Sequence, residues 1–235
     1  MARVFNQADY THKRNEILDA ALRKVYTVGY DSMSIQDILD DLKISKGAFY
    51  HYFESKPDLL HGIISRMMDE IFLAINPILD DASLDALAKF KNYFMTASIW
   101  KSQRLEQMLP IIRVWYADEN ILVREKIYSA SEEKIVPFLS GIIRQGVNEG
   151  TFHTNAPDES AHIVYGLMFA LGVALSRQLL RPPPGGIDEA RLFKLTDEYT
   201  RVIEITLGMQ RGSVEIFTHA TLHQWIETIV PHMQA

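Results

Sequence analysis

The sequence contains no cysteine, so it offers neither a disulfide framework nor thiolate ligands for a metal, and a reducing compartment is expected. Residues 1–16 lack the apolar run of a signal peptide, which favours a cytoplasmic protein over a secreted one. The longest apolar stretch, 163–175, is too short to cross a bilayer, so no membrane association is expected. Glycine-rich phosphate loops and serine nucleophile motifs are also lacking, and nothing in the pattern supports an enzyme or a bound cofactor.

What is present has the balance of an ordinary globular protein, with 47% hydrophobic and 23% charged residues in a chain of 235. The net charge is -6, but it is unevenly distributed. Residues 1–56 carry eight Lys/Arg and eight Asp/Glu, whereas residues 57–235 carry 16 and 22. A neutral segment can still bind phosphates when its cations share one face, so overall acidity does not exclude a nucleic-acid partner.

Apolar residues repeat at helical spacing along the chain, and no convincing alternating strand is found, which predicts an all-α fold. Gly150 should end one of the helices. The predicted helices cover approximately 9–28, 34–41, a short segment after Ser45, 57–79, 83–100, 102–117, 119–149, 157–180, 188–210 and 213–233.

The N-terminal part has the pattern of a helix-turn-helix. Ser34 begins Ser-Ile-Gln-Asp, in which Asp37 completes a capping box and starts one short helix. The turn at 42–44 follows, and Ser45 can cap the next helix. Two short helices braced by a longer first helix form this motif, which places a recognition helix in the major groove of DNA.

The stretch "SKGAFYHYFESK" at 45–56 indicates which face of the second helix is exposed. Phe49 and Phe53 are four residues apart, so they share a side and should pack inward. Gly47 and His51 then lie on the outward face, with Tyr50 on its flank. The alternatives are that Tyr50 and His51 pack in the core and that Gly47 is merely tolerated.

An outward face of this kind suits contact with base edges. Gly47 permits close approach, Ala48 can touch a thymine methyl, and Lys46 and His51 can donate to bases. Tyr50, Tyr52 and Lys56 are placed to hold phosphates, which positions the helix without specifying sequence. The candidate DNA-binding residues are Ser34, Ser45, Lys46, Gly47, Ala48, Tyr50, His51, Tyr52 and Lys56.

The run "ILDAALRKVYTVGYDSMSIQDILDDLKISKGAFYHYFESKPDLL" resembles the DNA-binding domain of the tetracycline-repressor (TetR) family of bacterial regulators. The resemblance covers about residues 10–60. It implies a three-helix DNA-binding domain at 1–55 and a larger helical effector-binding and dimerisation domain at 56–235. It also implies a homodimer that represses by binding a near-palindromic operator and is released by a small molecule.

The resemblance further implies a ligand cavity among the middle helices. The residues there that would give an adaptable apolar lining are Phe94, Trp100, Met108, Ile111, Trp115, Tyr116, Tyr128, Tyr165, Met168 and Phe169. A mainly apolar effector, with a ring, is therefore expected. Any one of these side chains could instead belong to the ordinary core of a helical domain.

A helix that is apolar on nearly every side, such as 157–180, needs cover on two sides, so we expect it to form the dimer interface with one of the last two helices. Glu215, His219 and His223 repeat at four-residue spacing, but no metal-site motif accompanies them and no metal is expected. Two other readings stay open. One is a DNA-binding activator or architectural protein without an effector, and the other is a helical ligand-binding or enzymatic protein whose helix-turn-helix is vestigial.

Overall fold

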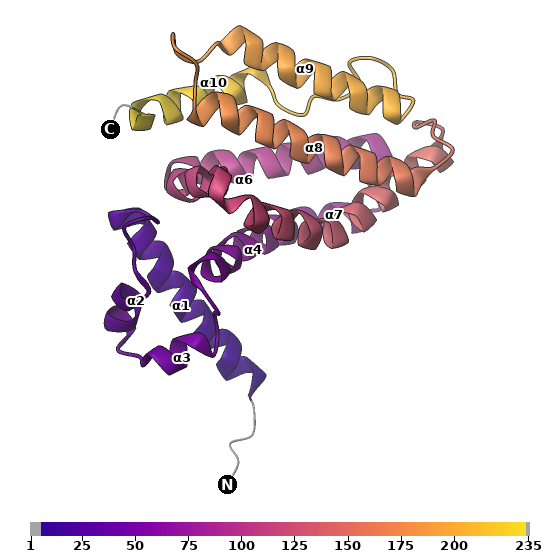
Figure 1. Ribbon diagram of the computed structural model, residues 1–235. Coiled ribbons are helices and arrows are strands. Elements are labelled where there is room, and N and C mark those ends of the chain that lie inside the picture. Colours follow the sequence, from indigo (N-terminus) through magenta and orange to yellow (C-terminus); the bar gives the residue numbers. More distant parts are fainter. Residues whose placement is uncertain (1–5, 234–235) are drawn as a thin grey trace. The chain divides into compact units, whose positions relative to one another are not determined.

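The computed structural model describes residues 6–233, and this part of the chain is built from helices without a strand (Figure 1), which confirms the predicted all-α fold. Two short 3-10 turns, η1 (Asp118–Asn120) and η2 (Val230–Met233), accompany the helices. The α-helices, in chain order, are α1 (Gln7–Val28), α2 (Ile35–Leu42), α3 (Lys46–Tyr50), α4 (Lys56–Ile75), α5 (Pro77–Asp80), α6 (Ala86–Trp115), α7 (Ile121–Glu149), α8 (Pro157–Leu180), α9 (Glu189–Thr206) and α10 (His219–Ile229).

The chain forms two compact units. Unit 1 consists of Met1–Met67 together with Gln107–Ile127, and unit 2 consists of Met68–Glu106 together with Tyr128–Ala235. Unit 1 therefore holds the helix-turn-helix and a second segment from the middle of the chain. The functional boundary expected between residues 55 and 56 stays a prediction.

The core of unit 1 forms where α1, α2, α3 and the start of α4 meet. Gly62 on α4 allows a close approach, because a Cβ there would lie 2.9 Å from Phe53 Cε1 and 3.0 Å from Leu18 Cδ2. Two ion pairs connect these helices at the surface. Arg66 of α4 pairs with Asp19 of α1 at 2.7 Å, and Arg23 of α1 pairs with Asp41 of α2 at 2.9 Å. The fully buried apolar side chains include Ile17, Leu18, Ala21, Ile38, Phe49, Phe53, Leu59 and Leu60.

The helices predicted over 83–100 and 102–117 are in fact one helix, α6, so the predicted break was wrong. Polar residues at 101–103 interrupt the apolar pattern, but none of them lacks a backbone N–H or disfavours helical dihedrals. The helix begins at Ala86, after Asp85, whose carboxylate accepts from the N–H of Ala88 at 2.7 Å.

The helix predicted over 213–233 begins later, at His219, which is a second correction. The preceding loop is held by the buried carboxylate of Glu204, whose Oε1 accepts from the N–H of Val214 at 3.2 Å. Thr218 then caps α10, because its hydroxyl accepts from the N–H of Thr221 at 3.0 Å. Hydrogen bonds to the Glu204 carboxylate and the Thr218 hydroxyl therefore stabilise a loop before α10, where the sequence pattern predicted helix.

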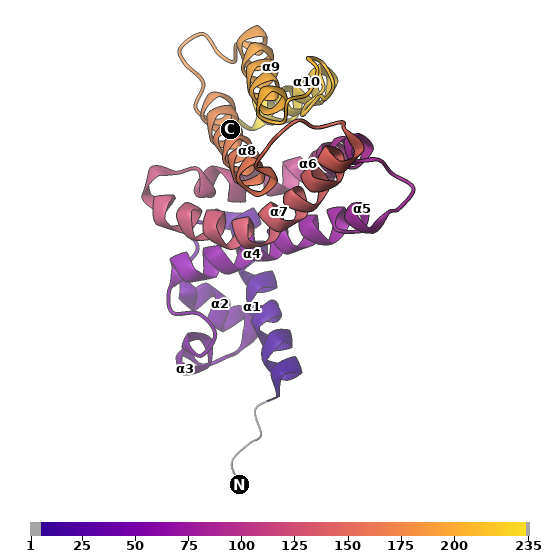
Figure 2. The ribbon, with the colours of Figure 1, turned by 90° about the vertical axis from the view of Figure 1, so that its right-hand side faces the viewer.

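In unit 2, α8 and α9 lie side by side and α10 packs against both (Figure 2). The indole Nε1 of Trp225 on α10 donates to the hydroxyl of Ser102 on α6 at 2.7 Å. Helix α8 is the one helix within residues 6–233 that is long and apolar enough to cross a membrane by length and composition.

Candidate DNA-binding interface

The first short helix, α2, is fixed by reciprocal hydrogen bonds at its N-terminus. The Ser34 hydroxyl accepts from the N–H of Asp37 at 3.1 Å, and the Asp37 carboxylate accepts from the N–H of Ser34 at 2.7 Å. These bonds from Ser34 hold the pKa of Asp37 below its ordinary value. The predicted capping box is thus confirmed.

Three residues separate α2 from α3. Lys43 adopts a left-handed conformation with φ 52°, which turns the chain sharply after α2. Ile44 closes the turn by donating its N–H to the carbonyl of Leu39 at 3.1 Å. Ser45 then caps α3, since its hydroxyl accepts from the N–H of Ala48 at 3.1 Å.

Phe49 on α3 and Phe53, which follows the helix, form a fully buried aromatic pair. Phe49 and Phe53 are 0% and 1% exposed, and their ring centroids lie 5.9 Å apart. Arg14 of α1 covers the outside of Phe53 at 4.9 Å from its centroid. The inward facing predicted for both phenylalanines is therefore confirmed.

The outer side of α3 faces away from this core. Tyr50 is 44% exposed, and His51 and Lys46 are also exposed, so core packing of Tyr50 and His51 does not occur. The Lys46 ammonium lies 5.9 Å from the Tyr50 ring centroid, as expected for positions four apart on a helix. Ala48 is half-buried at the edge of this surface.

Gly47 lies at the exposed start of α3. Beyond the backbone of its own helix, a Cβ there would meet only the Ser45 hydroxyl oxygen, at 3.9 Å. Its backbone does not adopt a positive φ. Neither packing nor conformation within the chain therefore requires a glycine at this position.

The next residues turn back toward α1. The centroid of the Tyr10 ring lies 4.8 Å from that of Tyr52 and 5.7 Å from that of His51, which meets it in a T-shaped arrangement. Tyr52 is consequently half-buried, while His51 keeps an exposed side. The sequence pattern gave no signal for Tyr10, because its contact joins residues more than forty positions apart.

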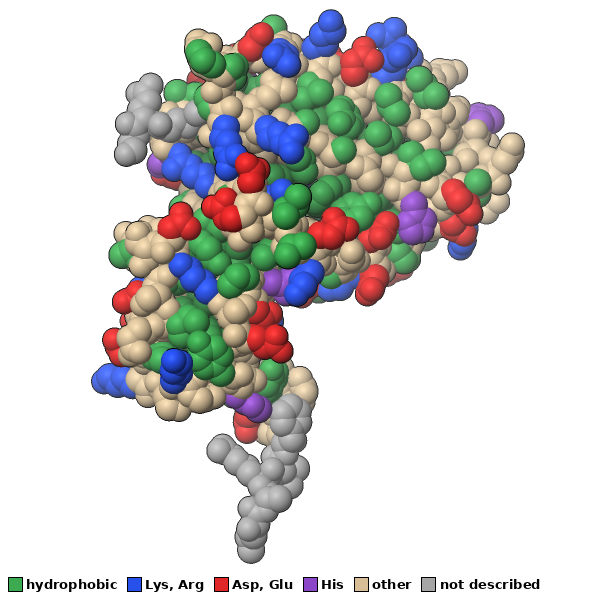
Figure 3. Space-filling view, in the orientation of Figure 1, with side chains coloured by type: hydrophobic (Ala, Val, Ile, Leu, Met, Phe, Trp, Pro, Cys, Tyr) green, Lys and Arg blue, Asp and Glu red, His purple; other side chains and the backbone are tan. Residues whose placement is uncertain are grey.

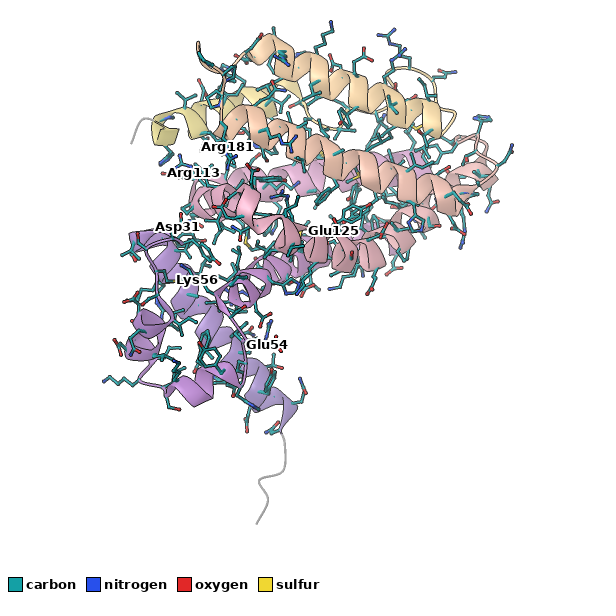
Figure 4. The ribbon with its side chains drawn as sticks, in the orientation of Figure 1. Asp31, Glu54, Lys56, Arg113, Glu125 and Arg181 are labelled. Atoms are coloured by element: carbon teal, nitrogen blue, oxygen red, sulfur yellow. The ribbon has the colours of Figure 1, made fainter. Side chains whose placement is uncertain are left out.

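Lys56 begins α4 and reaches the loop between α1 and α2 (Figure 4). Its ammonium donates to the backbone carbonyl of Asp31 at 3.2 Å and lies 4.5 Å from the Tyr30 ring centroid. Burial raises the pKa of Tyr30 to about 12, so this ring stays neutral beside the cation. Lys56 is half-buried and links this loop to the start of α4.

The expected ligand-binding residues are divided between the two units. In unit 2 Tyr128 contacts Tyr165 at 5.0 Å and Phe169 at 4.7 Å between ring centroids. Phe94 belongs to a separate chain of rings with Phe90 at 5.1 Å. The members in unit 2 are Phe94, Trp100, Tyr128, Tyr165, Met168 and Phe169.

The other four candidates, Met108, Ile111, Trp115 and Tyr116, belong to unit 1. Trp115 stacks on Tyr116 with centroids 5.6 Å apart. Arg124 donates to the carbonyl oxygen of Trp115 at 2.7 Å and closes the end of α6. The indole Nε1 of Trp115 is buried without a hydrogen-bond partner.

The histidines near the C-terminus make contacts with carboxylates and rings. His219 stacks on Phe193 at 4.1 Å, and His223 Nδ1 lies 2.8 Å from Glu189 Oε1. Glu215 precedes α10, so it does not continue the stripe of the two histidines. Across residues 6–233 no group of three His, Cys, Asp or Glu side chains could hold a metal ion.

Comparison with known proteins finds bacterial transcriptional regulators that resemble this chain. The family model described as bacterial regulatory proteins, tetR family, matches residues 17–63. An uncharacterised HTH-type regulator, YuxN of Bacillus subtilis, is 43% identical over 63 residues, which span 27% of this chain and 22% of YuxN. The transcriptional repressor DhaR of a Mycobacterium species is 26% identical over 63% of this chain and 74% of its own. KstR2 of Mycolicibacterium smegmatis, also a repressor, is 26% identical over 65% of this chain and 72% of its own.

Solved structures show the same fold over most of the chain. A TetR-family regulator from Pectobacterium atrosepticum has a TM-score of 0.60 and 19% identity over 88% of this chain and all of its own. A regulator from Cytophaga hutchinsonii has a TM-score of 0.59 and 21% identity over 83% of this chain and 97% of its own. The helix-turn-helix at residues 34–50 lies within the segment matched by the family model. Residues 17–63 therefore resemble the DNA-binding part of the TetR family of bacterial regulatory proteins, and the relatives support a helix-turn-helix transcriptional regulator.

Proposed function

We propose that this protein is a repressor that binds a near-palindromic operator as a homodimer and leaves it when a small molecule binds. The observation that carries the DNA-binding part is the open space beside Gly47 on the exposed side of α3. A glycine with no internal reason for its small size is explained when another molecule approaches its backbone closely. The base edges in a major groove are such a partner.

In this proposal the residues of the interface divide by role. Lys46 and His51 donate to base edges, and Ala48 contacts a thymine methyl. Tyr50, Tyr52 and Lys56 hold phosphates and set the register of the helix on the duplex. Ser34 and Ser45 complete the interface at the starts of α2 and α3.

The proposed homodimer uses the apolar surface of α8. Only 28% of the most apolar stretch of this helix is buried within the chain. Apolar side chains also reach the surface over α8 and α9 (Figure 3), where Ile163 is 51% and Ile205 is 63% exposed. A second copy, related by two-fold symmetry, would cover this surface and set two reading heads about 34 to 36 Å apart or somewhat more.

Release by an effector requires a helix that connects the DNA-binding residues to the effector-binding part of the chain, and α4 is the proposed connection. It starts at Lys56, beside the candidate phosphate contacts, and its later residues belong to unit 2. A ligand that binds the DNA-free form better than the operator-bound form would shift the equilibrium toward release. A tenfold loss of DNA affinity corresponds to about 1.4 kcal/mol of coupling.

The test is selection of bound sequences from random duplexes with the full chain. Enrichment of a sequence with two-fold symmetry is expected, and failure to enrich any sequence would refute the DNA-binding proposal. A Lys46→Ala variant in the same selection should relax the preference at one position of each half-site. Enrichment of a sequence without symmetry would contradict the homodimer and leave DNA binding intact.

A further inference from the structure

Two cations on α6 in unit 2 have no anionic partner among the residues that the structure describes. Lys101 and Arg104 are both half-buried, and they are three residues apart on the same side of the helix. Neither forms an ion pair with any carboxylate among residues 6–233. In a chain with a net charge of -6, two enclosed cations without a counter-ion are unexpected.

The neighbouring positions show that this segment of α6 is surrounded by protein. Trp100 is buried, and the Arg104 guanidinium lies 4.6 Å from the centroid of its ring. Ser102 is covered by Trp225 of α10, whose indole donates to its hydroxyl at 2.7 Å. Successive residues of a helix point about 100° apart, so Lys101 projects between these two covered directions.

The side of α6 on which Lys101 lies is otherwise apolar. Phe94 and Leu105, seven residues before it and four after it, lie on the same side of α6, and both are buried. Burial lowers the pKa of Lys101, and no carboxylate opposes this effect. Enclosing an ammonium without a partner destabilises a protein, which indicates that the charge serves something other than the fold.

We propose that Lys101 and Arg104 bind the carboxylate of an effector whose remaining part is apolar. The inference rests on the proposed effector-responsive function and deepens it, because a mainly apolar effector becomes an amphipathic acid. A carboxylate suits the site better than a phosphate, since a monoanion loses less hydration than a dianion when it is enclosed. The Arg104 fork can hold both oxygens, and the Trp100 ring offers a surface for the apolar part.

Calorimetry with the full chain and matched pairs of probes tests this site. The acids are phenylacetate, octanoate and decanoate, and each is compared with its primary amide. We expect at least one acid to bind, and its amide to bind at least about tenfold more weakly, since a hydrogen bond to a charged group typically contributes a factor of about 10 to 100. Lys101→Met should remove this preference, and Lys101→Arg should keep most of it.

Lys91→Met is the matched control, because Lys91 is an exposed lysine on the same helix, and this variant should bind like the wild type. Equal affinity for acid and amide, no bound acid, or an unchanged preference in Lys101→Met would each overturn the proposal. The melting temperature of the ligand-free protein gives a second readout. Lys101→Met should raise it, because an unpaired enclosed charge is removed, and a fall would overturn the proposal as well.

These measurements separate failure of the anion site from failure of effector release. If an acid binds in a Lys101-dependent manner but leaves the affinity for operator DNA unchanged, the anion site stands and effector release is refuted. If DNA is released by the amides as readily as by the acids, release stands and the anion site is refuted.

Discussion

A methyl group added to Gly47 would lie 3.9 Å from the Ser45 hydroxyl oxygen and meet nothing closer outside its own helix backbone. Gly47→Ala should therefore fold normally, and its free energy of unfolding should be unchanged or higher by up to about 1 kcal/mol because alanine favours a helix. Operator affinity should fall about tenfold, since the methyl group would occupy the space proposed for base edges. Urea unfolding and DNA titration measure the two effects.

Gly62→Ala is the matched control in the same unit. Its Cβ would lie 2.9 Å from Phe53 Cε1 and 3.0 Å from Leu18 Cδ2, so the core would have to shift. We expect a loss of about 1 to 3 kcal/mol of stability from this overpacking. If Gly47→Ala is destabilised as much as Gly62→Ala, the glycine in α3 is structural and the proposed close approach to DNA is wrong.

Lys46 and Lys56 should differ in how they affect specificity. Lys46→Ala should cost about 1 to 3 kcal/mol at one operator position, whereas Lys56→Ala should weaken all sequences alike and reduce the salt slope by about one. Because Lys56 also donates to the carbonyl of Asp31, its stability must be measured beside its DNA affinity. Equal losses on all sequences for both variants would contradict this division of roles.

The pH dependence of stability should be sensitive to His61. Burial, followed by the nearby charges of Lys126 and Arg14, lowers its pKa from the ordinary 6.5, although Asp58 opposes the effect. The unfolded chain then binds a proton more readily than the folded chain, so the contribution of His61 to stability is lost as the pH falls below about 6.5. Unfolding of His61→Gln, followed from about pH 8 to about pH 5, should depend less on pH than the wild type.

His223 is a control whose pKa is shifted in the opposite direction to that of His61. Its hydrogen bond to Glu189 raises its pKa, so its contribution is present below the ordinary value of 6.5 and is lost as the pH rises through the folded-state pKa. His223→Gln should therefore lose stability mainly at acidic pH. Identical pH profiles for both variants and the wild type would refute the two assignments.

The helix-turn-helix could be predicted well because its signals are local. The capping box of Ser34 and Asp37, the cap at Ser45 and the pair Phe49 and Phe53 each involve residues within four positions. These short-range rules fix both the helix starts and the buried side of α3. The same rules predicted which side of α3 is exposed in the candidate site.

What the sequence could not predict depends on distant contacts. The packing of Tyr52 on Tyr10 joins the segment after α3 to α1, and the late start of α10 depends on the buried carboxylate of Glu204. The false break at 101–103 arose because polar residues interrupt the apolar pattern there, although Lys101 is half-buried on the side of α6 that holds Phe94. Periodicity identifies apolar faces, but it does not indicate which polar residue is enclosed within one.

The dimer surface gives the last prediction. Ile205 on α9 is 63% exposed, and a charge placed there would be buried without a partner in the proposed homodimer. We expect Ile205→Glu to be monomeric at micromolar concentration by sedimentation and to bind full operator and half-site duplexes with similar affinity, because the second reading head is lost. Leu73→Glu is the control, since Leu73 on α4 is 73% exposed and lies outside α8 and α9. It should remain dimeric and distinguish the two duplexes.

The same experiment decides which late helix pairs with α8. If Val230→Glu, at the end of α10, produces monomers while Ile205→Glu does not, the interface consists of α8 and α10 instead of α8 and α9. If neither variant dissociates and the wild type sediments as a dimer, the exposed apolar side chains of α9 and α10 are not in the interface. A monomeric wild type would remove the homodimer altogether, and the weakly covered apolar stretch of α8 would need another partner.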